Sequence, residues 1–288
     1  MGTGRAVCIG VCEVAPDRIG ISLSRLASCD CDAMRMQALL LEQGFLYARY
    51  FRTEDALRDD VTAAIHQASL DSKAGDLFVL TFSGHGVQDK TRDANERDRL
   101  DEFWILRDGA WVDNDIRMAL KDFVAGVRIL VVSDSCHSGT VTSLLGTWAD
   151  GSLAELSRDE QILKVRGLNA IQPKEIPKDL WNLYKREEWA YLSARLSEPI
   201  VEAGAIDASV LLLAACSEDD VTLSGSPNSA FTTALLDVFG ETPAPATYDE
   251  LVTRIGQYPP ASLPFLNDDD VKDARGAIPF RKQRPFSI

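Results

Sequence analysis

Long hydrophobic runs and an excess of positive charge are both missing from this chain. No apolar run reaches the roughly 18 residues of a membrane helix, so we expect no membrane span. The 30 Lys and Arg residues are outnumbered by 44 Asp and Glu residues, and a net charge of −14 opposes binding to nucleic-acid phosphates. The start, MGTGRAVCIGVCEV, lacks the layout of a signal peptide or a myristoylation site. These features predict a cytoplasmic protein that binds neither nucleic acid nor membrane.

Cysteine and histidine are also scarce. Six cysteines are too few for a disulfide scaffold in a chain of 288 residues, so we expect reduced thiols. Cys8 and Cys12 are interpreted as small core residues of the first apolar run. Cys29 and Cys31 do not repeat a zinc-ribbon spacing, which disfavours zinc. Any chemistry that needs an imidazole has three candidates, which are His66, His85 and His137.

Short apolar runs alternate with amphipathic segments along most of the chain. Buried strands are predicted at 6–12, 77–82, 127–132 and 210–215, with weaker ones at 46–51 and 103–106. Helices are predicted at 33–43, 57–68, 114–123 and 231–239. This alternation is typical of an α/β protein with a parallel sheet covered on both faces.

Two stretches do not follow the alternation. The polar segment 88–111 is interpreted as a long solvated loop, although its length invites a functional role. The segment 145–199 has no strand pattern, includes a helical stretch that begins near Pro177, and is interpreted as an inserted connector. The proline-rich end predicts an edge strand and tail. We therefore expect one domain over 1–288, divided into 1–144, the connector 145–199 and 200–288.

Polar clusters follow two of the predicted strands. Ser83-Gly84-His85-Gly86 ends one strand, and the next ends in the cluster that contains Cys136. Loops at the carboxyl ends of parallel strands converge at one edge of the sheet, so the Cys136 thiol and the His85 ring can face one another. A helix beginning after Cys136 would favour its thiolate, with His85 as general base. His137 is the weaker candidate because adjacent side chains point to opposite sides, and His66 is expected to be solvated.

These motifs resemble those of the caspase-like cysteine peptidases, and specifically of the metacaspase branch. The histidine motif reads FSGHGVQ (82–88) and the cysteine motif DSCHSG (134–139). Further similarity lies at 26–33, 214–220 and Asn228–Thr232, so the resemblance covers nearly the whole chain except the connector. It implies a caspase-like αβα sandwich with a central, mostly parallel, six-stranded sheet.

The resemblance also implies a function. It predicts a cysteine endopeptidase that hydrolyses peptide bonds after Arg or Lys through a Cys136 thioester, with His85 as general base. The backbone amides of Gly86 and Cys136 would form the oxyanion hole. The substrate pocket would be walled by Asp32, Asp134, Ser83 and Cys29.

The charge of this pocket agrees with a basic substrate residue. Asp32 and Asp134 would pair with a guanidinium or an ammonium group and repel an aspartate side chain. Asp32 has a second interpretation as the cap of the helix that begins near Ala33, and the two roles are compatible.

Calcium is the candidate cofactor, although the dyad itself requires none. Carboxylates are the ligands that calcium prefers, and the candidate ligands after the histidine motif are Asp98, Asp101 and Asp113. The segment 113–116 reads DNDI where the family has DDEL, so one carboxylate is replaced by an amide. A solvated acidic loop remains the alternative interpretation.

Control and partners follow from the same resemblance. The connector contains eight basic residues, and self-cleavage is predicted there, with the bond Arg166–Gly167 as the first choice. We expect protein or peptide substrates with Arg or Lys before the cleaved bond and consider an activating partner protein. Two alternatives stay open, which are a catalytically silent caspase-like binding or scaffold module and transpeptidation by the same dyad.

Overall fold

A six-stranded sheet forms the centre of the protein. The computed structural model describes residues 2–15, 20–90, 100–136, 172–187, 192, 206–216, 223–258, 264–268 and 278–288. The strand order is β11-β9-β7-β3-β1-β2. All neighbours pair in parallel except β11, which is antiparallel to β9. The strands are β1 (Gly4–Gly10), β2 (Tyr47–Phe51), β3 (Leu77–Ser83), β7 (Arg128–Asp134), β9 (Ser209–Ala214) and β11 (Phe265–Asp268). The predicted mostly parallel six-stranded sheet is confirmed.

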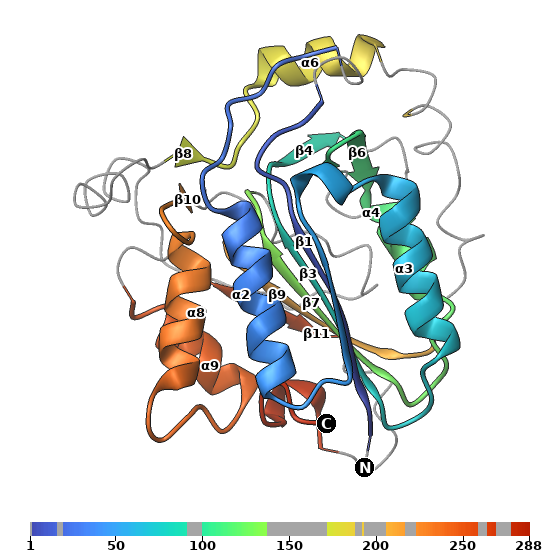
Figure 1. Cartoon of the computed structure of the whole chain (residues 1–288), viewed down its shortest axis with the longest axis vertical. Coiled ribbons are helices and arrows are strands. Elements are labelled where there is room, and N and C mark those ends of the chain that lie inside the picture. The colour runs from blue at the N-terminus through green and yellow to red at the C-terminus, as the bar shows by residue number, and fades with distance from the viewer. Residues whose placement is uncertain are drawn as a thin grey trace.

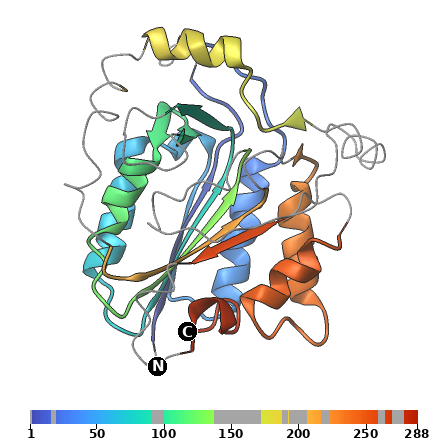
Figure 2. The same ribbon diagram turned by 180° about the vertical axis from the view of Figure 1, so that it is seen from behind.

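Helices cover both faces of this sheet (Figures 1 and 2). One face carries α2 (Cys29–Glu42), α8 (Ala230–Gly240) and α9 (Tyr248–Ile255), and the other carries α3 (Arg58–Leu70) and α4 (Asp113–Leu120). Strand β3 supplies both cores, because Phe78, Leu80 and Phe82 pack toward α3 and α4, whereas Leu77 and Val79 pack toward α2 and α8. The predicted αβα sandwich is confirmed. Short 3-10 turns lie at Thr53–Asp55 and Phe280–Lys282.

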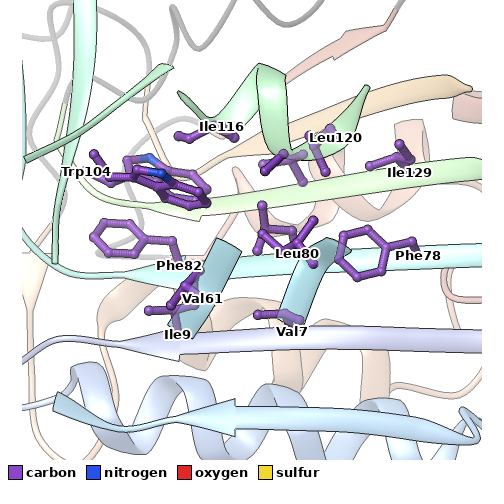
Figure 3. Packing of buried hydrophobic residues seen from close by; sticks show 14 of the residues in the cluster. Val7, Ile9, Val61, Phe78, Leu80, Phe82, Trp104, Ile116, Leu120 and Ile129 are labelled. Atoms are coloured by element: carbon purple, nitrogen blue, oxygen red, sulfur yellow. The ribbon is translucent and has the colours of Figure 1, made fainter. Parts of the chain in front are cut away.

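Stacked aromatic rings connect the main sheet to a second, smaller sheet. The rings of Phe82 and Trp104 are parallel within 7° at a centroid distance of 4.5 Å (Figure 3). Phe78 packs in the same core, and its ring lies 4.6 Å from that of Phe123. Trp104 belongs to a second sheet, so this contact fixes that sheet against the end of β3.

The segment 88–111 is not the solvated loop that its composition predicts. It contributes to an antiparallel sheet of β4 (Gly86–Lys90), β5 (Leu100–Leu106) and β6 (Gly109–Val112), and its most charged part lies outside the described residues. In β5, Trp104 and Leu106 pack toward the main core, and Phe103 and Ile105 toward a third cluster. The weaker strand predicted at 103–106 is confirmed as part of β5, while the dense charge before it obscured the rest of this sheet.

The described part of the connector is packed against this second sheet. It contains β8 (Gln172–Pro173), which pairs with β10 (Leu223–Ser224), and α6 (Lys178–Glu187). Trp181 of α6 lies 4.9 Å from the Phe103 ring, and the Ala110 amide donates a 2.8 Å hydrogen bond to the Tyr184 hydroxyl. The helical prediction is confirmed, the absence of a strand is corrected, and the three-part division of the chain stays a prediction.

Within the described ranges, no helix combines the length and apolar character of a membrane span.

Candidate active site

The histidine and cysteine motifs lie side by side at the carboxyl ends of β3 and β7. Ser83, the last residue of β3, is in register with Asp134, the last residue of β7. His85 and Cys136 each follow two residues later, and both are buried. The chains are so close that a Cβ on Gly86 would lie 2.5 Å from the Cys136 carbonyl oxygen. Only glycine fits at this position without displacing the cysteine motif.

Both ring nitrogens of His85 face backbone carbonyls. Nε2 lies 2.9 Å from the Ser24 oxygen, and Nδ1 lies 3.1 Å from the Lys174 oxygen. A carbonyl only accepts hydrogen bonds, so a neutral ring donates to one of the two oxygens and keeps a lone pair on its other nitrogen. Burial lowers the pKa of His85, and the Lys174 cation lowers it further, against the two carbonyl contacts. The ring is therefore suited to act as a neutral base.

The other two histidines lie apart from this site or outside the described residues. His66 is exposed and its Nδ1 lies 3.2 Å from Asp122, as its place off the apolar helix face predicts. His137 falls outside the described residues, as does the helix predicted after Cys136.

Lys174 occupies a closed pocket between the two motifs. Its side chain has 0% exposure, and its ammonium group has three acceptors, one for each hydrogen. Nζ lies 2.8 Å from Asp134 Oδ1, 2.8 Å from the Asp134 carbonyl oxygen and 2.9 Å from Ser83 Oγ. Asp32 Oδ2 lies further away, at 3.8 Å. The residues predicted to bind a basic substrate side chain thus surround a lysine of the same chain.

Asp32 is held by donors from two distant segments. Ser83 Oγ donates to Oδ2 at 2.8 Å, while the Asn228 side chain and the Ser229 amide donate to Oδ1 at 3.0 and 2.9 Å. Burial raises the pKa of Asp32, against the lowering by the Lys174 cation and these hydrogen bonds. The cap interpretation is wrong, because α2 begins at Cys29 with Ser28 as the N-cap residue.

The start of α8 holds the second carboxylate. The hydroxyls of Ser229 and Thr232 donate to Oδ2 of Asp134, the latter at 3.1 Å. Oδ1 therefore remains turned to the Lys174 ammonium group. Sequence reasoning quoted this segment, 228–232, only for its resemblance and missed its contacts with both acids.

Cys29, the fourth predicted wall residue, is buried at the first turn of α2. Burial raises the pKa of its thiol, and Lys174 and Asp32 are close enough to influence it. Its sulfur shares a hydrogen bond with Cys12. Cys216, which the sequence did not single out for the site, donates from its thiol to the Ser135 carbonyl at 3.4 Å, next to Cys136.

The backbone of Lys174 also makes close contacts with the histidine motif. The Gly86 amide donates to the Lys174 carbonyl oxygen at 3.2 Å, and His85 Nδ1 faces the same oxygen. The amide predicted for an oxyanion hole thus points to the carbonyl of the residue that fills the pocket. Sequence reasoning did not separate Lys174 from the seven other basic residues of the connector.

The described residues do not assemble a calcium site. Asp98 lies outside them, and Asp101 is in β5 opposite Asp89 of β4. Asp113 is buried at the start of α4, where its Oδ1 accepts the Asn114 amide at 2.7 Å. In the part of the chain that the structure describes, no group of three His, Cys, Asp or Glu residues is placed to hold a metal ion. Calcium binding stays a prediction.

Comparison with known proteins agrees with the fold and the motifs. The family model described as "Caspase domain" matches residues 3–258, and the chain belongs to this family. It is 31% identical to Metacaspase-1 of Cryptococcus neoformans over 163 residues, which are 50% of this chain and 33% of that protein. Over 92 residues it is 35% identical to Metacaspase-2 of Arabidopsis thaliana, covering 30% of this chain and 22% of that protein. The predicted resemblance to metacaspases is confirmed.

A solved structure matches over almost the entire length. Protein GSU0716 from Geobacter sulfurreducens is similar with a TM-score of 0.76 and 29% identity, and the match covers 99% of each chain. The curated relatives in contrast are matched over only about a third of their length or less.

Proposed function

We propose that the protein is a cysteine endopeptidase that cleaves peptide bonds after Lys or Arg, with Cys136 as nucleophile and His85 as general base. The observation that carries this proposal is the position of Lys174. Its ammonium group lies in the acidic pocket, and its carbonyl oxygen accepts from the Gly86 amide beside the catalytic motifs. A substrate residue before the cleaved bond needs both contacts.

This geometry supports the following chemistry. His85 Nδ1 takes the Cys136 proton, and the sulfur attacks the carbonyl carbon of the basic residue. The carbonyl oxygen becomes negatively charged and is stabilised by the amides of Gly86 and Cys136. His85 then protonates the leaving nitrogen, the C–N bond breaks, and a thioester remains on Cys136. Water, deprotonated by His85, hydrolyses the thioester. Ser24 is a positioning residue whose carbonyl keeps the ring hydrogen on Nε2.

The pocket selects for positive charge. Two buried carboxylates, Asp32 and Asp134, face the one ammonium group of Lys174, so the pocket as a whole remains acidic. An acidic substrate side chain would add a third negative charge, and a neutral one would leave both acids without a cation. Only Lys or Arg therefore satisfies the pocket.

The same contacts point to a site of self-cleavage. The bond Arg166–Gly167, our first choice from the sequence, lies outside the described residues. We now propose the bond Lys174–Glu175, because Lys174 already has the two contacts of a substrate residue. While this bond is intact, the lysine side chain fills the pocket and excludes other substrates.

Peptide cleavage by purified protein tests the proposal. Fluorogenic peptides ending in Lys, Arg or Asp are given to the wild type, Cys136→Ala and Asp134→Asn, with calcium and with chelator. We expect cleavage after Lys and Arg only, none by Cys136→Ala, and strong loss in Asp134→Asn. Cleavage after Asp, or activity that survives Cys136→Ala, would reject the mechanism. The chelator arm decides the calcium prediction, and product analysis separates hydrolysis from transpeptidation.

Self-cleavage has its own readout. Mass spectrometry of the incubated wild type should find a fragment that begins at Glu175, which Lys174→Gln abolishes. Lys178→Gln is the matched control, since Lys178 is exposed at the start of α6. A catalytically silent scaffold would give neither fragments nor peptide cleavage while remaining folded. A cytoplasmic location and an activating partner remain predictions.

A further inference from the structure

Two thiols outside the catalytic dyad lie in contact beside the pocket. Cys12 follows β1 and packs with Leu26 and Cys29 in a small cluster separate from the main cores. The side chains of Cys12 and Cys29 share a hydrogen bond. The proposed hydrolysis uses neither sulfur, so this pair needs an explanation of its own.

The surroundings give the two thiols different chemistry. The Asp30 amide, in the first turn of α2, donates to the Cys12 sulfur at 3.4 Å, and the amino end of a helix stabilises a thiolate. The hydrogen bond from Cys29 lowers the pKa of Cys12 to about 7, and that from the Asp30 amide adds to it, against the effect of burial. Burial raises the pKa of Cys29, which keeps its proton. Cys12 therefore has the character of an attacking thiolate and Cys29 that of its partner thiol.

Access to the pair follows the same order. Cys12 retains 3% of its surface exposed, whereas Cys29 retains 0%. Both thiols are therefore buried, and of the two only Cys12 retains any contact with solvent.

We propose that Cys12 and Cys29 are a redox-active pair that closes reversibly to a disulfide and thereby weakens the substrate pocket. With hydrogen peroxide as oxidant, the Cys12 thiolate attacks one peroxide oxygen, the O–O bond breaks, and hydroxide leaves to become water. Cys12 is then a sulfenic acid. The Cys29 sulfur attacks the Cys12 sulfur, the S–O bond breaks, and the hydroxide takes the Cys29 proton as a second water. Two thiols are oxidised, and one peroxide is reduced to two waters.

The disulfide would act on the pocket through α2, and this second part rests on the proposed function. A covalent S–S bond of about 2.05 Å is far shorter than a contact between two separate sulfurs, so closing it draws the start of α2 toward the end of β1. Asp32 lies one turn into α2, and its carboxylate is one of the two that face the basic side chain. Ser24, whose carbonyl contacts the His85 ring, lies five residues before Cys29 and would move with it. The Asp32 carboxylate and the Ser24 carbonyl would therefore be displaced together.

Disulfide mapping tests the first part without any need for activity. Cys136→Ala protein is treated with hydrogen peroxide, the remaining thiols are alkylated, and unreduced peptides are sequenced by mass spectrometry. We expect a link between Cys12 and Cys29 that persists in the added variant Cys31→Ser and disappears in Cys12→Ser. Cys31 is the matched control, two residues further along α2 and only partly buried. Full alkylation of both thiols, or a link from Cys12 to Cys31, would overturn the proposal.

Cleavage of a lysine peptide tests the second part. Wild type and Cys12→Ser receive the same peroxide pulse and are assayed before and after reduction by dithiothreitol. Oxidation of Cys136 affects both proteins, so we expect an additional loss of several-fold in kcat/KM only in the wild type, restored by reduction. Equal losses would show that the disulfide does not act on the pocket. If no protein cleaves the peptide before oxidation, the proposed function fails, while the mapped link still decides the disulfide.

Discussion

Lys174 Nζ lies 2.8 Å from Oδ1 of Asp134, and the two side chains are exposed by only 0% and 3%. The lysine comes from the connector, and the aspartate ends the central strand β7. Breaking an ion pair that is buried this deeply is costly, because each charge would be left without water and without its partner. The pair therefore connects the stability of the fold to the occupancy of the proposed substrate pocket.

Removing the lysine should destabilise the protein in a way that depends on pH. In the Cys136→Ala background, Lys174→Met leaves Asp32 and Asp134 buried without their cation, which costs about 3–5 kcal/mol near pH 8. The pKa of Asp32 is already raised in the fold and rises further without Lys174, so stability present at low pH is lost as the pH rises through that pKa. Urea unfolding at pH 5 and pH 8 measures the difference.

The control for this prediction is Lys178→Met, which alters an exposed lysine and should change the unfolding free energy by less than about 0.5 kcal/mol. A loss from Lys174→Met that is equal at both pH values would contradict the assigned role of the carboxylates.

A methyl group at Gly86 should disable the site. The added Cβ meets the Cys136 carbonyl oxygen at 2.5 Å and Ser135 Cβ at 2.9 Å, so the Gly86 amide must move. Loss of one oxyanion donor lowers kcat by about 100-fold or more. Gly240→Ala is the control, because its Cβ would find no atom within 4 Å. Wild-type kcat in Gly86→Ala would remove this amide from the mechanism.

Thr232 should affect substrate binding through Asp134. Its hydroxyl donates to Oδ2 at 3.1 Å, and Thr232→Val replaces that hydroxyl by a methyl group of similar size. A hydrogen bond to a charged group is worth about 1.5–3 kcal/mol, so KM for lysine peptides should rise about ten-fold or more with kcat nearly unchanged. Thr233→Val, on the exposed side of the same helix, should leave KM unaltered. Equal effects of both variants would mean that Thr232 acts only through α8 stability.

His85 should titrate below its ordinary pKa of 6.5, because it is buried near the Lys174 cation. Between pH 6.5 and the lower folded value, the unfolded chain binds a proton that the folded chain does not. Stability from this group is therefore complete above pH 6.5 and is lost as the pH falls through that window. NMR titration of the ring in Cys136→Ala, assigned with His85→Gln, checks the direction. A midpoint above 6.5 would contradict the neutral base.

The main sheet was predictable because its strands are short, continuous apolar runs. The run at 77–82 has every residue buried, as expected of a parallel strand covered on both faces. Strands β4 and β6 were missed, and only 103–106 of β5 was predicted, because alternation in an amphipathic strand is weaker and charged residues at 89–102 obscured it. The start of α2 was predicted too late in the sequence. Cys29 and Asp32 are buried beside the candidate site, and their residue types do not follow an ordinary amphipathic helix pattern.

The dyad residues were predicted from their motifs, and the pocket from the resemblance. The occupant of the pocket was not found, because Lys174 and Asp134 are 40 residues apart and no local pattern links them. One signal was available, since Pro173 and Pro177 on either side of Lys174 favour extended backbone of the kind that a substrate adopts. Asn228 and Ser229 reach Asp32 from 196 and 197 residues away, a relation that only the folded chain reveals.

The substrate pocket takes Asp32, Ser83 and Asp134 from before the connector and their supports Asn228 and Ser229 from after it. Strand β9 is likewise hydrogen-bonded into the sheet beside β7. After cleavage at Lys174 the two fragments should therefore stay associated in one folded protein. A denaturing gel would show two bands where a sizing column shows a single peak with the mass of the uncut chain.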